Sequence, residues 1–237
     1  MSADREGIAA HSEIQRAESE VTGVFQTIER ETKMDAQQIM DSEEFKRCAT
    51  FHGHICPGLS IGYKAAKVAL ERLGEKRADD EEVVAVVETD ACSADAVQVL
   101  TGCTFGKGNL ICRDYGKMVL TLLSRKTGRG FRVAMRPDAF PPDETHFQLL
   151  SKVMSGKADD EEAARFRELH LQRSRDVLNM PAEKLFDVKS VQMTLPSRAK
   201  IEPSEPCSRC GEPTMHTKLK TVDGRKLCRD CLEQRMC

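Results

Sequence analysis

The sequence lacks any apolar run approaching the roughly 18 residues that a membrane-spanning helix needs. Its first residues, MSADREGIAAHSE, also lack the apolar core of a secretory signal. Aromatic residues make up only 5% of the 237-residue chain, and tryptophan is absent. The length suits one substantial domain plus a smaller module. We therefore expect a soluble, cytoplasmic protein that does not associate with membranes.

The sequence also lacks a strong charge of either sign, because its formal net charge is only −2 at pH 7. Residues 1–40 carry four basic and eight acidic groups, whereas residues 197–237 carry nine basic and six acidic groups. This small positive excess is far from a polybasic tail, and residues 197–237 contain no aromatic ring for stacking on bases. We do not expect nucleic acid to be a partner.

Cysteine, in contrast, is abundant, with ten residues in the sequence. Four stand in two Cys-x-x-Cys pairs near the end, and the others are scattered singly, so a disulfide scaffold is not indicated. In a reducing compartment these thiols remain available for metals or for chemistry.

Three segments are expected along the chain. Residues 1–40 form a helical extension whose apolar stripe (Ile14, Val21, Ile28) either reaches a partner copy of the chain or docks on its own domain. Residues 41–196 form the core, and residues 197–237 form a small module that follows a proline-marked linker.

Within the core, apolar periodicity and turn residues define the elements. Small residues on the helix that follows Pro57 predict a close approach by another element. Helices are expected at 43–50, 59–73, 95–100 and twice within 143–178, and strands at 83–87, 109–113, 118–123, 131–135 and 188–195.

The tail carries the most specific motif. Seventeen residues separate the pair Cys207 and Cys210 from the pair Cys228 and Cys231, with an Asp-Gly hairpin turn between them. Two such pairs complete a tetrahedral set of four thiolates, which suits a structural Zn²⁺ ion and leaves no open position. The alternative is a set of redox-active thiol pairs. We predict a zinc ribbon.

The loop FHGHICPG holds a second cluster, in which His52, His54 and Cys56 alternate before a helix. A helix N-terminus lowers the pKa of a thiol, so Cys56 is a candidate thiolate for metal binding, nucleophilic or redox work. His54 and Cys56 can face one point. The alternative is a buried thiol beside two structural histidines.

Further candidates stand in the segment ETDACSADAVQVLTGCTFGKGNL. Cys92 directly follows a strand, Cys103 ends the next short helix, and either could supply another ligand. Lys107 lies in a Gly-Lys-Gly loop that could cradle an anion, although the loop lacks the P-loop pattern. Cys48 and Cys112 are expected to be plain core residues.

The strings FHGHICPGLSIGYKAAKVAL, VVETDACSADAVQVLTGCTFGKGNL and RDYGKM resemble the FmdE family of formylmethanofuran dehydrogenase subunits over roughly residues 45–195. The resemblance implies an α+β core with a mixed or antiparallel sheet and packed helices, a dimer, and an association with a molybdenum or tungsten enzyme of one-carbon metabolism. Some members of the family carry a C-terminal zinc ribbon. The motif positions are His54, Cys56, Cys92, Asp95, Cys103, Lys107 and Asp114.

We therefore expect a metal-binding protein with a structural zinc ribbon and a second transition metal (Zn²⁺, Ni²⁺ or Fe²⁺) in the core. Its role would be redox, catalytic or metal-handling, and whether it is an enzyme stays open. The core residues expected to act are His54, Cys56 and Cys103 as ligands, Cys56, His54, Cys92 and Lys107 in chemistry, and Asp95 or Asp114 orienting an imidazole. The alternative is a regulatory or interaction protein whose ribbon contacts protein or nucleic acid.

Overall fold

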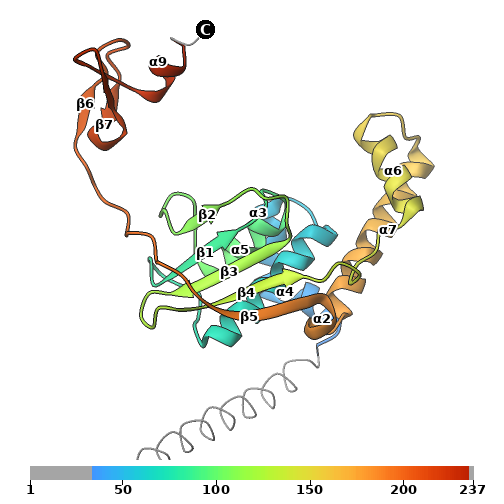
Figure 1. Ribbon diagram of the computed structural model, residues 1–237. Coiled ribbons are helices and arrows are strands. Elements are labelled where there is room, and N and C mark those ends of the chain that lie inside the picture. The colour runs from blue at the N-terminus through green and yellow to red at the C-terminus, as the bar shows by residue number, and fades with distance from the viewer. Residues whose placement is uncertain (1–33, 235–237) are drawn as a thin grey trace, which may run out of the picture. The chain divides into compact units, whose positions relative to one another are not determined.

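The structure of the protein is a computed structural model that describes residues 34–234 (Figure 1). The chain divides into two compact units, one ending at Pro196 and one beginning at Ser197. The apolar stripe expected at Ile14, Val21 and Ile28 lies outside the described residues. Between residues 34 and 234 there is no helix that combines the length and the apolar character needed to cross a membrane.

A five-stranded sheet with the order β2-β1-β3-β4-β5 forms the centre of the first unit. Its strands are β1 (Val83–Val87), β2 (Leu110–Cys112), β3 (Val119–Ser124), β4 (Arg129–Met135) and β5 (Phe186–Gln192). β1 pairs in parallel with β2, and all other neighbours are antiparallel. The expected α+β class with a mixed sheet is confirmed.

Most helices of this unit begin at residues whose side chains accept a backbone N–H, whereas α5 and α8 have no such cap. Ser42, Asp143 and Asp159 cap α3, α6 and α7 in this way, which satisfies donors that a helix start leaves unpaired. The helices are α2 (Ala36–Asp41), α3 (Glu43–His52), α4 (Pro57–Leu73), α5 (Ser93–Thr101), α6 (Glu144–Met154), α7 (Asp160–Asn179) and α8 (Ala182–Leu185).

The core follows from the alternation of side chains along the sheet. Val83, Ala85 and Val87 of β1 belong to the large apolar cluster that also holds the buried faces of α3, α4 and α5. Val84 and Val86 point to the opposite face, where a smaller cluster includes partly buried residues that follow β5. All five residues of β1 are buried, as an unbroken run of β-branched residues and alanine predicts.

The small residues of α4 admit the start of α5, as the sequence predicts. A Cβ atom added to Gly62 would lie 2.3 Å from the backbone oxygen of Ser93, so no larger residue fits there without a shift. A Cβ added to Gly58 would lie 3.1 Å from Cβ of Cys92. This close packing holds the first turns of α4 and α5 against each other.

Most element boundaries differ from the sequence prediction by one to three residues, and two differences at element ends have a cause in the tertiary structure. β5 ends at Gln192 instead of residue 195, because its partner strand β4 begins at Arg129, which pairs with Gln192. α2 crosses the expected boundary at residue 40 and packs against α7, where the backbone N–H of Ala36 donates to the side-chain oxygen of Asn179.

α6 and α7 form a helical hairpin that follows β4 and precedes β5 in the chain, and it projects away from the sheet in which these two strands are paired (Figure 1). A capping box at Asp159 starts α7, with its side chain accepting from the backbone of Glu162 and the Glu162 side chain accepting in return. The two helices pack on each other, and α7 also packs on α4.

The second unit consists of two short hairpins and a final helix. Asp223 and Gly224 both have positive φ, as the Asp-Gly turn predicts for the hairpin that they connect. Its elements are β6 (Ser204–Pro206), β7 (Pro213–Met215), the 3-10 helix η1 (His216–Lys218), β8 (Lys220–Val222), β9 (Arg225–Leu227) and α9 (Arg229–Glu233).

Candidate metal centre

The loop between α3 and α4 is held at both ends by residues with special backbone roles. Gly53 ends α3 in the left-handed conformation, with φ of 95°. Cys56 is the N-cap of α4, and its Sγ accepts the backbone N–H of Leu59 at 3.2 Å. Pro57 occupies the first helical turn, where its missing N–H costs nothing. The local sequence therefore fixes the position of the Cys56 sulfur.

His52 lies between an acid and a thiol. Its Nδ1 is 2.7 Å from Oδ2 of Asp95, and its Nε2 is 3.6 Å from Sγ of Cys56. Asp95 reaches the ring from the first turn of α5. With the carboxylate on Nδ1, the Nε2 nitrogen is the one left to face the thiol. This is the arrangement in which a carboxylate orients an imidazole that ligates a metal.

Cys92 completes a group with His52 and Cys56. One ligand atom from each of these residues lies within 4.8 Å of the other two. Gly58 makes this possible, since a Cβ there would meet Cys92 and lie 3.8 Å from Sγ of Cys56. Two thiols and one imidazole at these separations can hold a transition-metal ion.

A second group shares the same thiol. Ligand atoms of His54, Cys56 and His170 also lie within 4.8 Å of one another. His170 comes from α7, and its Nδ1 is 2.8 Å from Nε2 of His146 on α6. The rings of His54 and His170 are nearly parallel, at 24°, with their centroids 6.5 Å apart.

The electrostatics of these groups correct one sequence expectation. Burial, together with the neighbouring Cys92 thiol, raises the pKa of Cys56 to about 11 against the lowering effect of the Leu59 N–H. Without a bound cation, burial thus outweighs the lowering of the thiol pKa that the place of Cys56 at a helix start predicts. A bound cation would reverse this.

The surroundings of His170 and of its neighbour His146 favour the neutral imidazole. Burial and the imidazoles of His146 and His54 lower the pKa of His170 to about 4. Burial and Arg173 likewise lower the pKa of His146. Neutral imidazole is the form that binds metals, so both groups carry donors suited to a transition-metal ion.

A cavity of about 860 Å³ opens beside this loop. Its lining is mostly apolar, with three phenylalanines, and its polar residues include His54, His146 and His170. It lies between the loop that carries Cys56 and the helical hairpin of α6 and α7. Its size suits a small organic ligand.

The structure does not bring Cys103 or Lys107 to this place. Cys103 is buried, and its Sγ contacts the backbone oxygen of Val83 at 3.4 Å, at the start of β1. Nζ of Lys107 donates to the backbone oxygens of Asp79 and Asp80. Both residues follow the C-terminal end of α5, whereas Cys92 precedes its N-terminal end.

The other residues singled out in the sequence have local roles. Asp114 accepts from the backbone of Gly116 in its own turn, so of the two acids only Asp95 contacts an imidazole in the described chain. Cys48 is buried in the core as expected. Cys112 is exposed at the end of the edge strand β2, so the expectation that it packs in the core is wrong.

Sequence reasoning missed three residues of the site as ligands or ligand supports. His52 belongs to the noted loop, and its position four residues before Cys56 is the signal that could have identified it. His146 and His170 stand in charged or amphipathic helices far along the chain. Nothing in their local sequence connects them with residues 54 and 56.

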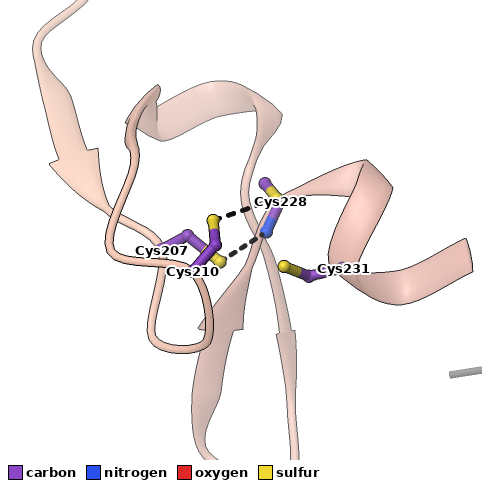
Figure 2. A group of neighbouring side chains, drawn as sticks. All are labelled: Cys207, Cys210, Cys228 and Cys231. Atoms are coloured by element: carbon purple, nitrogen blue, oxygen red, sulfur yellow. Dashed lines mark hydrogen bonds between the residues drawn. The ribbon is translucent and has the colours of Figure 1, made fainter. Parts of the chain in front are cut away.

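The four tail cysteines form one tight group (Figure 2). Sγ atoms of Cys210 and Cys228 are 3.9 Å apart, and Sγ of Cys207 accepts the backbone N–H of Cys228 at 3.3 Å. Backbone N–H groups lower the pKa of Cys207 to about 6, whereas burial and neighbouring thiols raise the pKa of Cys231 to about 12. Four sulfurs, which are the ligand atoms that the described residues bring together here, fit a structural Zn²⁺ ion.

The fold and the two cysteine-containing sites define an α+β protein with a C4-type zinc finger. Residues 51–187, more than half of the chain, match the family described as FmdE, molybdenum formylmethanofuran dehydrogenase operon. The chain belongs to the FmdE family. Residues 200–235 match the prokaryotic dksA/traR C4-type zinc finger, which confirms the predicted zinc ribbon.

The chain is also similar to two individual proteins. A protein of Archaeoglobus fulgidus described as "Probable S-adenosyl-L-methionine-binding protein" is 35% identical over 192 residues, covering 78% of this chain and 51% of that protein. The chain thus spans about half the length of this curated relative. The crystal structure of a tungsten formylmethanofuran dehydrogenase FmdE-like protein from Syntrophus aciditrophicus matches with a TM-score of 0.54 and 23% identity, covering 85% of this chain and 94% of that chain. This likeness shows the shared fold.

Proposed function

We propose that the core unit binds a transition-metal ion through His52, Cys56 and Cys92. The observation that carries this proposal is the contact of His52 with Asp95 on one ring nitrogen and with Cys56 on the other. The proposed site differs from the sequence hypothesis in using His52 in place of His54, and of the two further thiols that the sequence offered it uses Cys92 and not Cys103. Cys56 is common to both.

The donor set indicates which ions fit. Two thiolates and a neutral imidazole favour Zn²⁺, Ni²⁺ or Fe²⁺ and disfavour Mg²⁺ and Ca²⁺. Three protein ligands would leave a coordination position open, as catalytic and ion-exchanging sites do. Asp95 would keep the proton on Nδ1 of His52 and so present the Nε2 lone pair. Cys56 would lose its proton when a cation binds, since burial keeps it neutral otherwise.

For the protein as a whole we propose a redox, catalytic or metal-handling role alongside a molybdenum or tungsten enzyme of one-carbon metabolism. The names of the family and of the Syntrophus aciditrophicus protein support this link. The protein would act as a homodimer in the cytoplasm, with the ribbon zinc serving only to fold the second unit.

Metal analysis of the full chain tests the core site. The wild-type protein, purified under reducing conditions with Zn²⁺, Ni²⁺ or Fe²⁺ supplied, should retain one ion for the ribbon and one for the core. His52→Ala and Cys92→Ser should each lose the core ion and keep the ribbon ion. Cys112→Ser is the matched control, because Cys112 is an exposed thiol outside both groups. Equal metal content in all four proteins would refute the proposal.

A second candidate function is the binding of an S-adenosyl-L-methionine-like ligand in the cavity. The description of the Archaeoglobus fulgidus relative and the cavity of about 860 Å³ favour it. Its phenylalanine rings could pack against an adenine ring or against a cationic sulfonium. Calorimetry with S-adenosyl-L-methionine should show binding that Phe166→Ala weakens. No heat of binding at millimolar ligand would exclude this candidate.

A further inference from the structure

The sulfur of Cys56 belongs to both candidate metal groups, and the two groups differ in where they open. His54 is exposed, His170 is half-buried, and both line the cavity. The ring of His52 stands 4.5 Å from that of His54, centroid to centroid, and so lies next to the second group while turning its Nδ1 to Asp95. Cys56 thus stands between two sets of donors. The inner set is His52 and Cys92, and the outer set, which faces the cavity, is His54 and His170.

We propose that His54, Cys56 and His170 form a second ion position, which the Cys56 thiolate bridges to the ion held by His52, Cys56 and Cys92. This inference rests on the proposed function for the first ion. The second position should bind a divalent transition-metal ion, because two imidazoles and one thiolate are available to coordinate it.

Each group has an imidazole whose remote nitrogen is engaged by a neighbour. Asp95 does this for His52 at 2.7 Å, and His146 does it for His170 at 2.8 Å. With Nδ1 of His170 in contact with His146, its Nε2 is the nitrogen left for an ion. His146 in turn stacks on Phe166, with ring centroids 5.5 Å apart, which restricts its orientation. In the outer position, as in the inner one, a neighbouring side chain therefore holds the imidazole that would coordinate the ion.

The charges of the donor groups predict which of the two positions binds its ion more tightly. The inner group supplies two thiolates and has the Asp95 carboxylate behind its imidazole, whereas the outer group supplies only the shared thiolate and two neutral imidazoles. The outer ion should therefore bind more weakly and exchange faster. Its open coordination positions face the cavity, where an incoming ligand can reach it.

Titration of the metal-free full chain with Co²⁺, under reducing conditions, tests the outer position. The wild type should bind one ion in the ribbon, one tightly in the core and one more weakly. His170→Gln should lose only the weak ion. His146→Gln should keep it with about tenfold lower affinity, the effect of removing a partner behind a ligand. His216→Gln, a histidine of the second unit, is the control and should match the wild type.

Electron paramagnetic resonance supplies a readout that a folding defect would not imitate. Two Co²⁺ ions joined by one thiolate should couple, so the spin signal per core cobalt should fall when the weak ion binds. His170→Gln should show no such fall, with far-UV circular dichroism confirming its fold. An unchanged stoichiometry in His170→Gln, or binding of the weak ion without spin coupling, would overturn the inference.

The outcome also separates the two proposals. A single core ion that is lost in His52→Ala and kept in His170→Gln leaves the proposed function standing and rejects the second position. A core ion lost in His170→Gln but kept in both His52→Ala and Cys92→Ser rejects the proposed inner site, and with it the bridged pair.

Discussion

Nδ1 of His52 lies 2.7 Å from a carboxylate oxygen of Asp95, and this contact ties the last residue of α3 to the first turn of α5. The pair is half-buried, with about a tenth of the His52 side chain and a third of the Asp95 side chain exposed to solvent. The acid thereby sets which nitrogen of the ring faces Cys56. It acts as a positioning residue for the inner metal group.

Asp95→Asn should weaken the affinity of the inner site for Zn²⁺ by about 10- to 100-fold, because the charged partner behind the imidazole is lost. Competition with a chromophoric chelator measures this affinity. Asp114→Asn is the matched control, since Asp114 accepts only within its own turn and contacts neither group. Equal losses in the two variants would contradict the assignment.

The Cys56 thiol should react slowly with iodoacetamide when no metal is bound. Its pKa of about 11 means that thiolate forms only as the pH rises toward that value, so at pH 8 alkylation should be on the order of 100-fold slower than for an ordinary thiol. Mass spectrometry of alkylated peptides measures the rate, with exposed Cys112 as an internal standard. A Cys56 rate at pH 8 equal to that of Cys112 would be inconsistent with this electrostatic picture.

Gly62→Ala should destabilise the core by about 1–3 kcal/mol, the usual cost of overpacking. The added Cβ would lie 2.3 Å from a backbone oxygen at the start of α5, which cannot move as a side chain can. Gly106→Ala provides the control, because Gly106 has an ordinary φ and open space around it. Chemical denaturation followed by circular dichroism gives both values, and similar midpoints would argue against tight packing of α4 on α5.

Cys228→Ser should unfold the second unit while the first persists. Structural zinc supplies roughly 10–16 kcal/mol of apparent folding free energy to such small modules at pH 7, and three remaining thiols hold the ion far less well. Limited proteolysis should then remove the chain beyond about Pro196, whereas the melting temperature of the core stays unchanged. A tail that resists protease without metal would show that zinc is not needed for its fold.

We also predict that the protein is a homodimer, with a mass by light scattering about twice 26.5 kDa at micromolar concentration. Phe147 and Met154 are seven residues apart and so share one face of α6; they leave 66% and 79% of their surface exposed at the rim of the cavity, and an apolar face of this kind can bind a second copy of the chain. Phe147→Asp should shift the mass toward the monomer. Phe105→Asp should not, although Phe105 is 85% exposed on a separate loop. A wild-type monomer would exclude the dimer.

The sequence was sufficient for the ribbon ligands and for locating the loop of the core site, although it did not identify His52 as the ligand within that loop. The ribbon cysteines stand in two local pairs, and the loop from His52 to Cys56 is fixed by Gly53 and Pro57. The same holds for the elements of the sheet and for the small residues of α4, whose periodicity is local. Only the strand limits depended on partners, as the end of β5 at Gln192 shows.

The sequence was insufficient for predicting ligands that are far apart in the chain and that only the fold brings together or keeps apart. Cys92 and Cys103 flank α5, and nine helical residues separate its ends by roughly 13 Å, so both thiols cannot reach one ion. A motif gives the order of such residues but not which end of a helix faces the site. His170 reaches the loop only because α7 packs on α4 beside it, a tertiary contact that no local pattern encodes.

The hairpin of α6 and α7 follows β4 and precedes β5 in the chain, so the pairing of the two strands and the lining of the cavity depend on different residues. The register of β4 and β5 depends on their own pairing, from Arg129 with Gln192 to Met135 with Phe186. The cavity and the outer donors depend on the hairpin. Changes in its length or lining should therefore alter what the site admits without shifting any strand. We expect relatives that bind different ligands to differ in the residues of this hairpin, while the inner group of His52, Cys56 and Cys92 and the sheet stay constant.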